Sequence, residues 1–328
     1  MTSKCYTVAP NPQSEIPNPQ SEIPMRSSAY LALGVICIVW GTTYTAIKFA
    51  IHDFPPFMMA GLRQTAAGLL LLGIALAKGK MQIPDRQYLW KQSLTGIFTI
   101  AGGNGLITWG MQFVSSGLSA IIGALTPVVV VLINLFWRGG ERPSGPILAG
   151  VILGFAGLGV IFQDGWRDFL NPDYRLGILA CFGSCFTWSL GTVMAKRYNA
   201  PGTSPLLNAG LQVTAGGLGA LVLSALFDPA WTNKPSTEAW LALGYLALIG
   251  SALAFTLYMF ALQHLSATVS SLYTYINPIV AVLLGWLWLG ETMSASIALG
   301  MSVTIAGIWL VNSGYAWTAL KTGMKLRR

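Results

Sequence analysis

The sequence is divided into ten long apolar runs, and this pattern limits what the chain can fold into. The runs span about 29–51, 56–77, 91–113, 117–137, 146–163, 175–195, 205–227, 238–262, 267–289 and 295–317. A helix needs about 20 apolar residues to cross a bilayer. Because helices satisfy their own backbone hydrogen bonds in lipid, we predict an all-α polytopic membrane protein with ten transmembrane helices.

Composition and charge favour the same class. Of the 328 residues, 54% are hydrophobic and only 9% are charged, too few charges to cover a soluble globule. With the N-terminus in the cytoplasm, 14 Lys and Arg residues lie in inside segments and three in outside loops. The positive-inside rule then places both termini in the cytoplasm and the chain in the cytoplasmic (inner) membrane. The net charge of +8 therefore needs no nucleic-acid partner, and the expected surroundings are a lipid bilayer.

Two polar tails flank the apolar runs. Residues 1–28 include a direct duplication of the letters NPQSEIP, first at Asn11–Pro17 and again at Asn18–Pro24. Such a segment buries no core, so we expect a disordered cytoplasmic tail. Met25 remains an alternative start. Residues 318–328 form a basic cytoplasmic tail.

The two halves of the chain repeat each other. The letters AGLRQTAAGL at Ala60–Leu69 return as AGLQVTAGGL at Ala209–Leu218, with seven of the ten positions identical. Residues 29–163 and 175–317 are therefore predicted to be two five-helix repeats. Because five is odd, the second repeat enters the membrane inverted. Inverted repeats are typical of secondary transporters, whose substrate site lies near the midplane between the halves.

Several residues resemble a known family. They are the Trp40–Gly41 pair with Lys48, the turn Leu265–Ala267, the prolines Pro127 and Pro278, the run Leu284–Glu291, and Gly300 with Gly307. Over about residues 29–315 the chain resembles the ten-helix, EamA-type branch of the drug/metabolite transporter superfamily. An intruding Arg138 is the main departure. The resemblance implies alternating-access transport of amino acids, their derivatives or other small metabolites, commonly outward.

Known catalytic signatures are missing from the sequence, including HExxH, GxSxG and the Walker A loop. Cys181 and Cys185 share helical spacing but lack further metal ligands nearby, so we expect no metal, no cofactor and no enzymatic activity. We therefore favour a transporter with a small-molecule substrate. The alternatives are a non-transporting partner or sensor subunit and a membrane-embedded lipid-handling enzyme.

Two cations lie inside apolar runs. Lys48 is three residues from the end of its run and can extend to the interface. Arg63 lies deeper, where charge is costly, and its repeat partner is the neutral Gln212. A guanidinium offers a fork to a carboxylate. Arg63 is thus a candidate for binding a substrate carboxylate, with structural pairing to Asp53 as the equal alternative.

The other candidate substrate-binding residues are aromatic or uncharged side chains inside the runs. They are Trp40, Tyr44, Asn104, Trp109, Trp188, Thr192, Asn208, Tyr258, Tyr273 and Asn277. An aromatic-lined cavity would suit apolar or aromatic metabolites, and ordinary core packing is the alternative. Asn104 stands in the stretch Gly102–Gly105, a weak place for a helix and a candidate cavity wall.

Prolines, acidic residues and glycines suggest how such a carrier would move. Pro127 and Pro278 lie deep in runs at equivalent places, as hinges or as packing kinks. Glu141 and Glu291 close the fourth and ninth runs and are candidate gating groups. Proton-coupled carriers usually have a buried carboxylate or histidine, and acidic residues are lacking deep in the runs. Uncoupled exchange and facilitated export therefore remain alternatives to proton coupling. Glycines in the fifth and tenth runs predict a scaffold or dimer surface, so a homodimer is left open.

Overall fold

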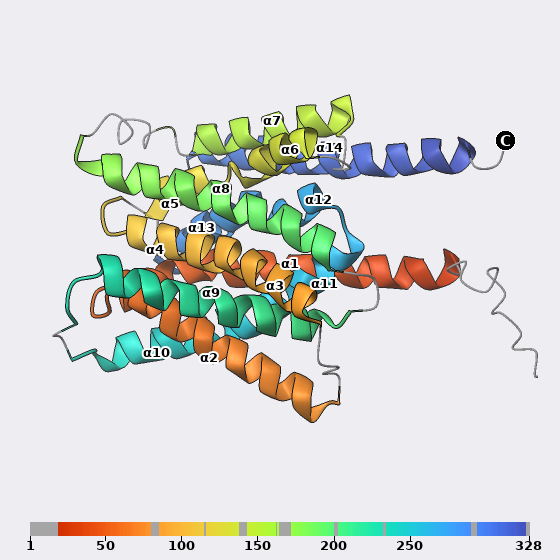
Figure 1. The fold of residues 1–328 in the computed structure, drawn as a ribbon. Helices are drawn as coiled ribbons and strands as arrows, with labels where there is room; N and C mark the ends of the chain where they lie inside the picture. Colours follow the sequence, from red (N-terminus) through yellow and green to blue (C-terminus); the bar gives the residue numbers. More distant parts are fainter. Residues whose placement is uncertain are drawn as a thin grey trace, which may run out of the picture.

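The fold is a bundle of helices, seen in a computed structural model (Figure 1). The structure describes residues 19–79, 85–114, 116–137, 143–161, 163, 172–199, 203–231, 234–289 and 294–325. These residues contain helices and turns but no strand. Six helical segments among them are long and apolar enough to cross a membrane. The predicted all-α polytopic architecture is confirmed.

Each of the ten apolar runs contains helix. In chain order they hold α1 (Pro19–Ala50); α2 (Pro56–Ala77); α3 (Arg86–Gly96), η1 (Ile97–Gly105) and α4 (Leu106–Gly110); α5 (Ser116–Gly123) and α6 (Thr126–Phe136); α7 (Gly145–Ile161); α8 (Arg175–Tyr198), preceded by η3 (Pro172–Tyr174); α9 (Pro205–Phe227); α10 (Thr237–Tyr245), η4 (Leu246–Leu253) and α11 (Ala254–His264); α12 (Ala267–Ser271) and α13 (Tyr273–Leu289); and α14 (Ala295–Lys325). Helix α1 begins before residue 29, where the first run was expected to start. The start of α1 and the end of α14 lie at the same end of the bundle, called here the terminal end (Figure 1).

Repeat-related helices pack against each other in antiparallel pairs. The two most extensive contacts join α2 to α9 and α7 to α14. In the first pair, Gly61 faces Leu221 and Gly68 faces Thr214, so residue numbers rise in one helix as they fall in the other. A Cβ added at Gly68 would lie 2.5 Å from the backbone nitrogen of Thr214, which shows how closely the backbones approach. The shared AGL motifs therefore form the junction between the two halves.

The glycine face of the fifth and tenth runs is used within one chain. A Cβ added at Gly157 would lie 2.7 Å from the Gly300 carbonyl oxygen, and one at Gly150 would lie 2.7 Å from that of Gly307. Close approach of this kind favours helix association in lipid. The glycines of α7 and α14 thus cover each other, as expected for a scaffold, beside the other helices (Figure 1).

Four spans are irregular at matched places. The third and eighth contain the π-helical segments η1 and η4, which begin 149 residues apart, the offset of the repeat itself. The fourth span breaks between α5 and α6, and the ninth between α12 and α13. Pro127 was expected deep inside a continuous helix, but it stands in the first turn of α6. A proline cannot donate to the turn before it, so a new helix begins there. Pro278 does lie inside α13.

The two repeat-related lysines cap helix ends. The Lys48 Nζ donates to the carbonyl oxygens of Met111, at 2.6 Å, and Val114, just after α4. Lys196 Nζ donates to those of Leu262, at 2.8 Å, and Leu265, at 2.7 Å, around the end of α11. The last carbonyls of a helix lack intrahelical donors and carry partial negative charge. Both lysines therefore join the first span of a repeat to the end of its third span.

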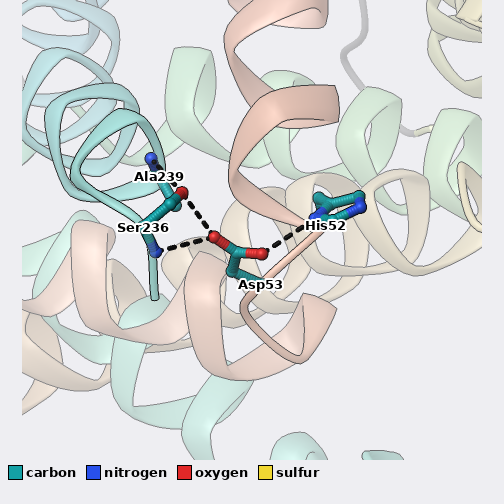
Figure 2. A network of polar contacts seen from close by, with 4 residues as sticks. All are labelled: His52, Asp53, Ser236 and Ala239. Carbon is teal, nitrogen blue, oxygen red and sulfur yellow. Dashed lines mark hydrogen bonds and ion pairs between the residues drawn. The ribbon is translucent and has the colours of Figure 1, made fainter. Parts of the chain in front are cut away.

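A hydrogen-bond network ties the two repeats together (Figure 2). It joins the α1–α2 turn to the start of α10, which lie at the end opposite the terminal end (Figure 1). Asp53, in the α1–α2 turn, accepts hydrogen bonds from the Ser236 backbone nitrogen at 2.8 Å and from its hydroxyl at 2.5 Å. The His52 ring lies 2.8 Å from the other carboxylate oxygen. Ser236 itself caps the start of α10 by accepting from the Ala239 nitrogen. These hydrogen bonds lower the pKa of Asp53 to about 2. The Ser236 hydroxyl has the largest effect, followed by the Ser236 backbone nitrogen and then by the His52 ring.

We expect Lys48→Met and Lys196→Met each to destabilise the protein. Each substitution leaves helix-end carbonyls without their cationic donor, a loss of about 1–2 kcal/mol for a partly buried cap. Thermal unfolding in detergent would measure the effect, with the exposed Lys78→Met as the matched control. Equal midpoints for all three variants would contradict the capping role.

Asp53 is expected to make stability depend on pH. Because folding lowers its pKa from about 3.8 to about 2, its contribution is complete above the higher value and disappears as pH falls through the lower one. The difference in unfolding midpoint between the wild type and Asp53→Asn should therefore be constant above about pH 5 and shrink toward pH 2. The nearby exposed Glu238→Gln is the control. A difference that stays constant down to pH 2 would refute the network's role.

Candidate functional site

A cavity of about 90 Å³ lies between the two repeats. Its walls come from α1, α2, η1 and the α5–α6 junction on one side and from α8, η4 and α13 on the other. The predicted substrate-binding residues that line it are Trp40, Tyr44, Arg63, Asn104, Trp188, Tyr273 and Asn277. The fold therefore brings most of the predicted set to one place.

Arg63 is the only charged side chain among the described residues that line the cavity. It is 2% exposed. Its Nη2 donates to the Asn104 side-chain oxygen, whereas its Nε has no hydrogen-bond partner. The alternative that Arg63 pairs with Asp53 is wrong, because Asp53 engages Ser236 and His52 instead. A buried cation thus faces the cavity with a neutral partner and a free donor.

The π-helical segments supply both polar groups and backbone to the cavity. Asn104 belongs to η1, so the segment noted as weak for a helix holds Arg63 in place. In η4, the Gly250 carbonyl oxygen accepts a hydrogen bond from the Trp40 Nε1 at 2.8 Å. π-Helical turns are rare in proteins, but those that occur are often found at functional sites. Their geometry here explains why the third and eighth spans meet the cavity with both backbone and side chains.

Gln64 and Ser251 are among the polar residues of the cavity that sequence reasoning missed. Both are buried, and the Gln64 Oε1 and Ser251 Oγ have no hydrogen-bond partner. A buried polar atom without a partner is costly, so a cluster of them beside a cavity favours a polar ligand. The signal for Gln64 was its place next to Arg63. Nothing in the sequence marked Ser251, which lines the cavity from the π-helical segment η4.

Aromatic rings from both repeats form one wall of the cavity, called here the aromatic wall. The Trp40 ring lies 4.6 Å from that of Tyr273 and 5.6 Å from that of Trp188, both edge to face. Tyr258 packs behind them and its hydroxyl lies 2.6 Å from the Thr192 hydroxyl. Along α8 and α11 these last two residues lie a turn beyond the cavity, toward the terminal end. Thr192 and Tyr258 therefore follow the lining residues Trp188 and Phe255 along α8 and α11 on that side of the cavity.

Four predicted residues stand apart from the cavity lining. Tyr258 and Thr192 lie behind the aromatic wall, as described. The Trp109 ring packs against Phe113, with centroids 4.9 Å apart. Asn208 accepts a hydrogen bond from the Tyr88 hydroxyl and donates to Thr203. The structure gives these residues neighbours that belong to ordinary helix packing.

The structure describes the predicted hinge residues but not the predicted gating residues. Thr126 and Asn277, the residues before Pro127 and Pro278, both line the cavity. The Asn277 amide lies 3.0 Å from the carbonyl oxygens of Tyr273 and Cys37, so its nitrogen can donate to both and join α13 to α1. The proposed gating residues Glu141 and Glu291 lie outside the described residues.

Known proteins match the chain over nearly its whole length. Residues 27–163 and 175–313 each match the model of the EamA-like transporter family. The "Uncharacterized inner membrane transporter YedA" of Escherichia coli K12 is 33% identical over 284 residues, covering 86% of this chain and 90% of that protein. The "Uncharacterized transporter YoaV" of Bacillus subtilis is 27% identical, covering 85% and 95%.

A solved structure shares the fold. It is described only as "Crystal structure of protein", is 23% identical, and superposes with a TM-score of 0.71 over 87% of this chain and 97% of the other. The two family matches and the named relatives bear out the resemblance to the drug/metabolite transporter superfamily. The chain belongs to the EamA-like transporter family and is a multi-pass membrane transporter of that type.

Proposed function

We propose that this protein is a secondary transporter, not an enzyme, that moves small organic metabolites bearing a carboxylate across the cytoplasmic membrane. Amino acids and related compounds are the first class to test, and export is the proposed direction. The observation that carries the proposal is Arg63, a buried cation with an unpartnered Nε that faces a cavity between two inverted repeats. A guanidinium can donate two parallel hydrogen bonds to a carboxylate, and the aromatic wall suits the apolar part of such a substrate.

Alternating access follows from this arrangement as the proposed mechanism. With both termini in the cytoplasm, as the distribution of Lys and Arg favours, the aromatic wall lies on the cytoplasmic side of the cavity. The proposed cycle opens this wall, admits substrate beside Arg63, and then opens the opposite end. Pro127 and Pro278 stand next to lining residues of the fourth and ninth spans, where hinges would act. The cycle also needs the contact between Asp53 and Ser236 to release.

Counterflow into proteoliposomes tests this function. Purified protein would be loaded with each member of a panel of amino acids, 2-oxo acids and nucleobases, with and without a pH gradient. We expect label to accumulate for one carboxylate class and to be recovered chemically unchanged. Recovery of a modified product would favour an enzyme. Absence of counterflow for the whole panel, with folded protein, would count against the transporter function proposed here.

Arg63→Ala is expected to reduce counterflow at least tenfold at substrate concentrations below KM, because the carboxylate loses a charge-assisted partner. Insertion and the unfolding midpoint should remain close to those of the wild type. Arg175→Ala, which removes an exposed arginine at the start of α8, is the matched control and should transport normally. Full transport by folded Arg63→Ala protein would exclude Arg63 as the carboxylate site.

A further inference from the structure

The buried charge of Arg63 bears on how the carrier returns when it is empty. The guanidinium is 2% exposed, and the hydrogen bond found for it joins it to Asn104, a neutral amide. The described lining of the cavity holds no carboxylate. The nearest acidic residue along the chain, Asp53, is occupied by Ser236 and His52. The site by itself therefore carries one uncompensated positive charge.

That charge cannot easily leave the cavity. Arg63 lies on α2 between Gly61 and Gly68, two of the points where α2 meets α9 at close backbone range. Its guanidinium donates to Asn104 on η1, and Arg63 lines the cavity. An arginine near a helix end can extend to the interface, but this side chain is held inward. The cation therefore stays at the cavity.

An alternating-access cycle must pass through a state in which water is shut out of the cavity. Enclosing a lone cation in a low-dielectric site is unfavourable, whereas enclosing it with an anion is much less so. The Arg63 Nε has no hydrogen-bond partner, and it is the donor to which we assign the carboxylate that balances the charge. A bound monoanion thus lowers the barrier to reorientation that the empty carrier faces.

Resting on the proposed transport function, we propose that this protein is an exchanger of small monoanionic carboxylates. The incoming anion neutralises Arg63 and allows the return step that the empty carrier makes slowly. A zwitterion brings a second positive charge into a cavity whose described lining has no carboxylate to receive it. Within the proposed substrate class, carboxylates without an ammonium group, such as 2-oxo acids, are therefore favoured over the corresponding amino acids.

The test uses two probes that differ at one carbon. 4-Methyl-2-oxopentanoate and leucine share the same branched apolar body, and only leucine has an ammonium group. Labelled probe is trapped inside proteoliposomes, and its efflux is followed into buffer with or without the same unlabelled compound, with protein-free liposomes subtracted. Valinomycin and equal K⁺ on both sides carry the compensating charge, so that net anion efflux is not limited by a membrane potential. For the wild type we expect efflux of the 2-oxo acid to be at least tenfold faster with external anion, and leucine to move at less than one tenth of that rate.

Variants of Arg63 separate charge from shape. At saturating anion, Arg63→Gln keeps hydrogen-bonding capacity but has no charge to neutralise, so the ratio of exchange to net efflux should fall toward one. Arg63→Lys keeps the charge and should keep the ratio, while Arg175→Ala should match the wild type. The wild-type measurement stands by itself should a variant fail to fold.

The outcomes are distinguishable. Equal efflux of the 2-oxo acid with and without external anion would overturn the exchange mechanism, while transport itself, and so the proposed function, would stand. Faster movement of leucine than of the 2-oxo acid, or movement only of another panel compound, would overturn the monoanion class. No movement of any panel compound would remove the proposed function together with this inference.

Discussion

The structure depends on one constraint of the bilayer: a backbone polar group in lipid must find its partner within the protein. Regular helices meet this requirement by themselves, and irregular backbone is tolerated only where protein or a cavity surrounds it. The irregular segments obey this rule. The π-helical segments η1 and η4 both reach the cavity, and so do the residues before Pro127 and Pro278. In each case a side chain compensates nearby backbone, as Trp40 does for the Gly250 carbonyl and Thr126 for that of Gly123.

The inverted repeat explains which residues are structural and which are specialised. Lys48 and Lys196 make equivalent hydrogen bonds at opposite ends of the bundle. Their matching positions in the two repeats therefore reflect a structural role that both repeats share. Arg63 and Gln212 occupy equivalent places but do different things. Gln212 donates to the Gln92 side chain at 2.6 Å within the helix packing, whereas Arg63 faces the cavity. The two repeats therefore differ at this position, where only the first repeat has a charged side chain. Arg63 gives the cavity a positive charge on one side.

The sequence alone was enough to predict the class, the repeats and much of the site, because each rests on a pattern along the chain. Apolar runs of bilayer length predict helices, and matched motifs predict paired halves. Arg63 stood out because a charge in an apolar run is rare. Ser251 and Gln64 did not, since their relevance depends on a π-helical turn and on unpartnered atoms. Conversely, Asn208 and Trp109 looked functional by residue type, but their neighbours in space are other helices.

At the proposed carboxylate site, Arg63 would trade stability of the fold for selectivity toward the substrate. Burial of a cation beside a neutral amide is unfavourable, and an apolar side chain of similar size would often pack there at lower cost. The fold supports the charge with tight α2–α9 packing and with Asn104, which η1 directs at the guanidinium. These features fix the cation without neutralising it. A salt bridge would have removed the unfavourable charge, but it would also have removed the attraction for an anion. Asn104 is a neutral partner for the guanidinium and the Arg63 Nε stays unpartnered, as the proposed reversible carboxylate site would require.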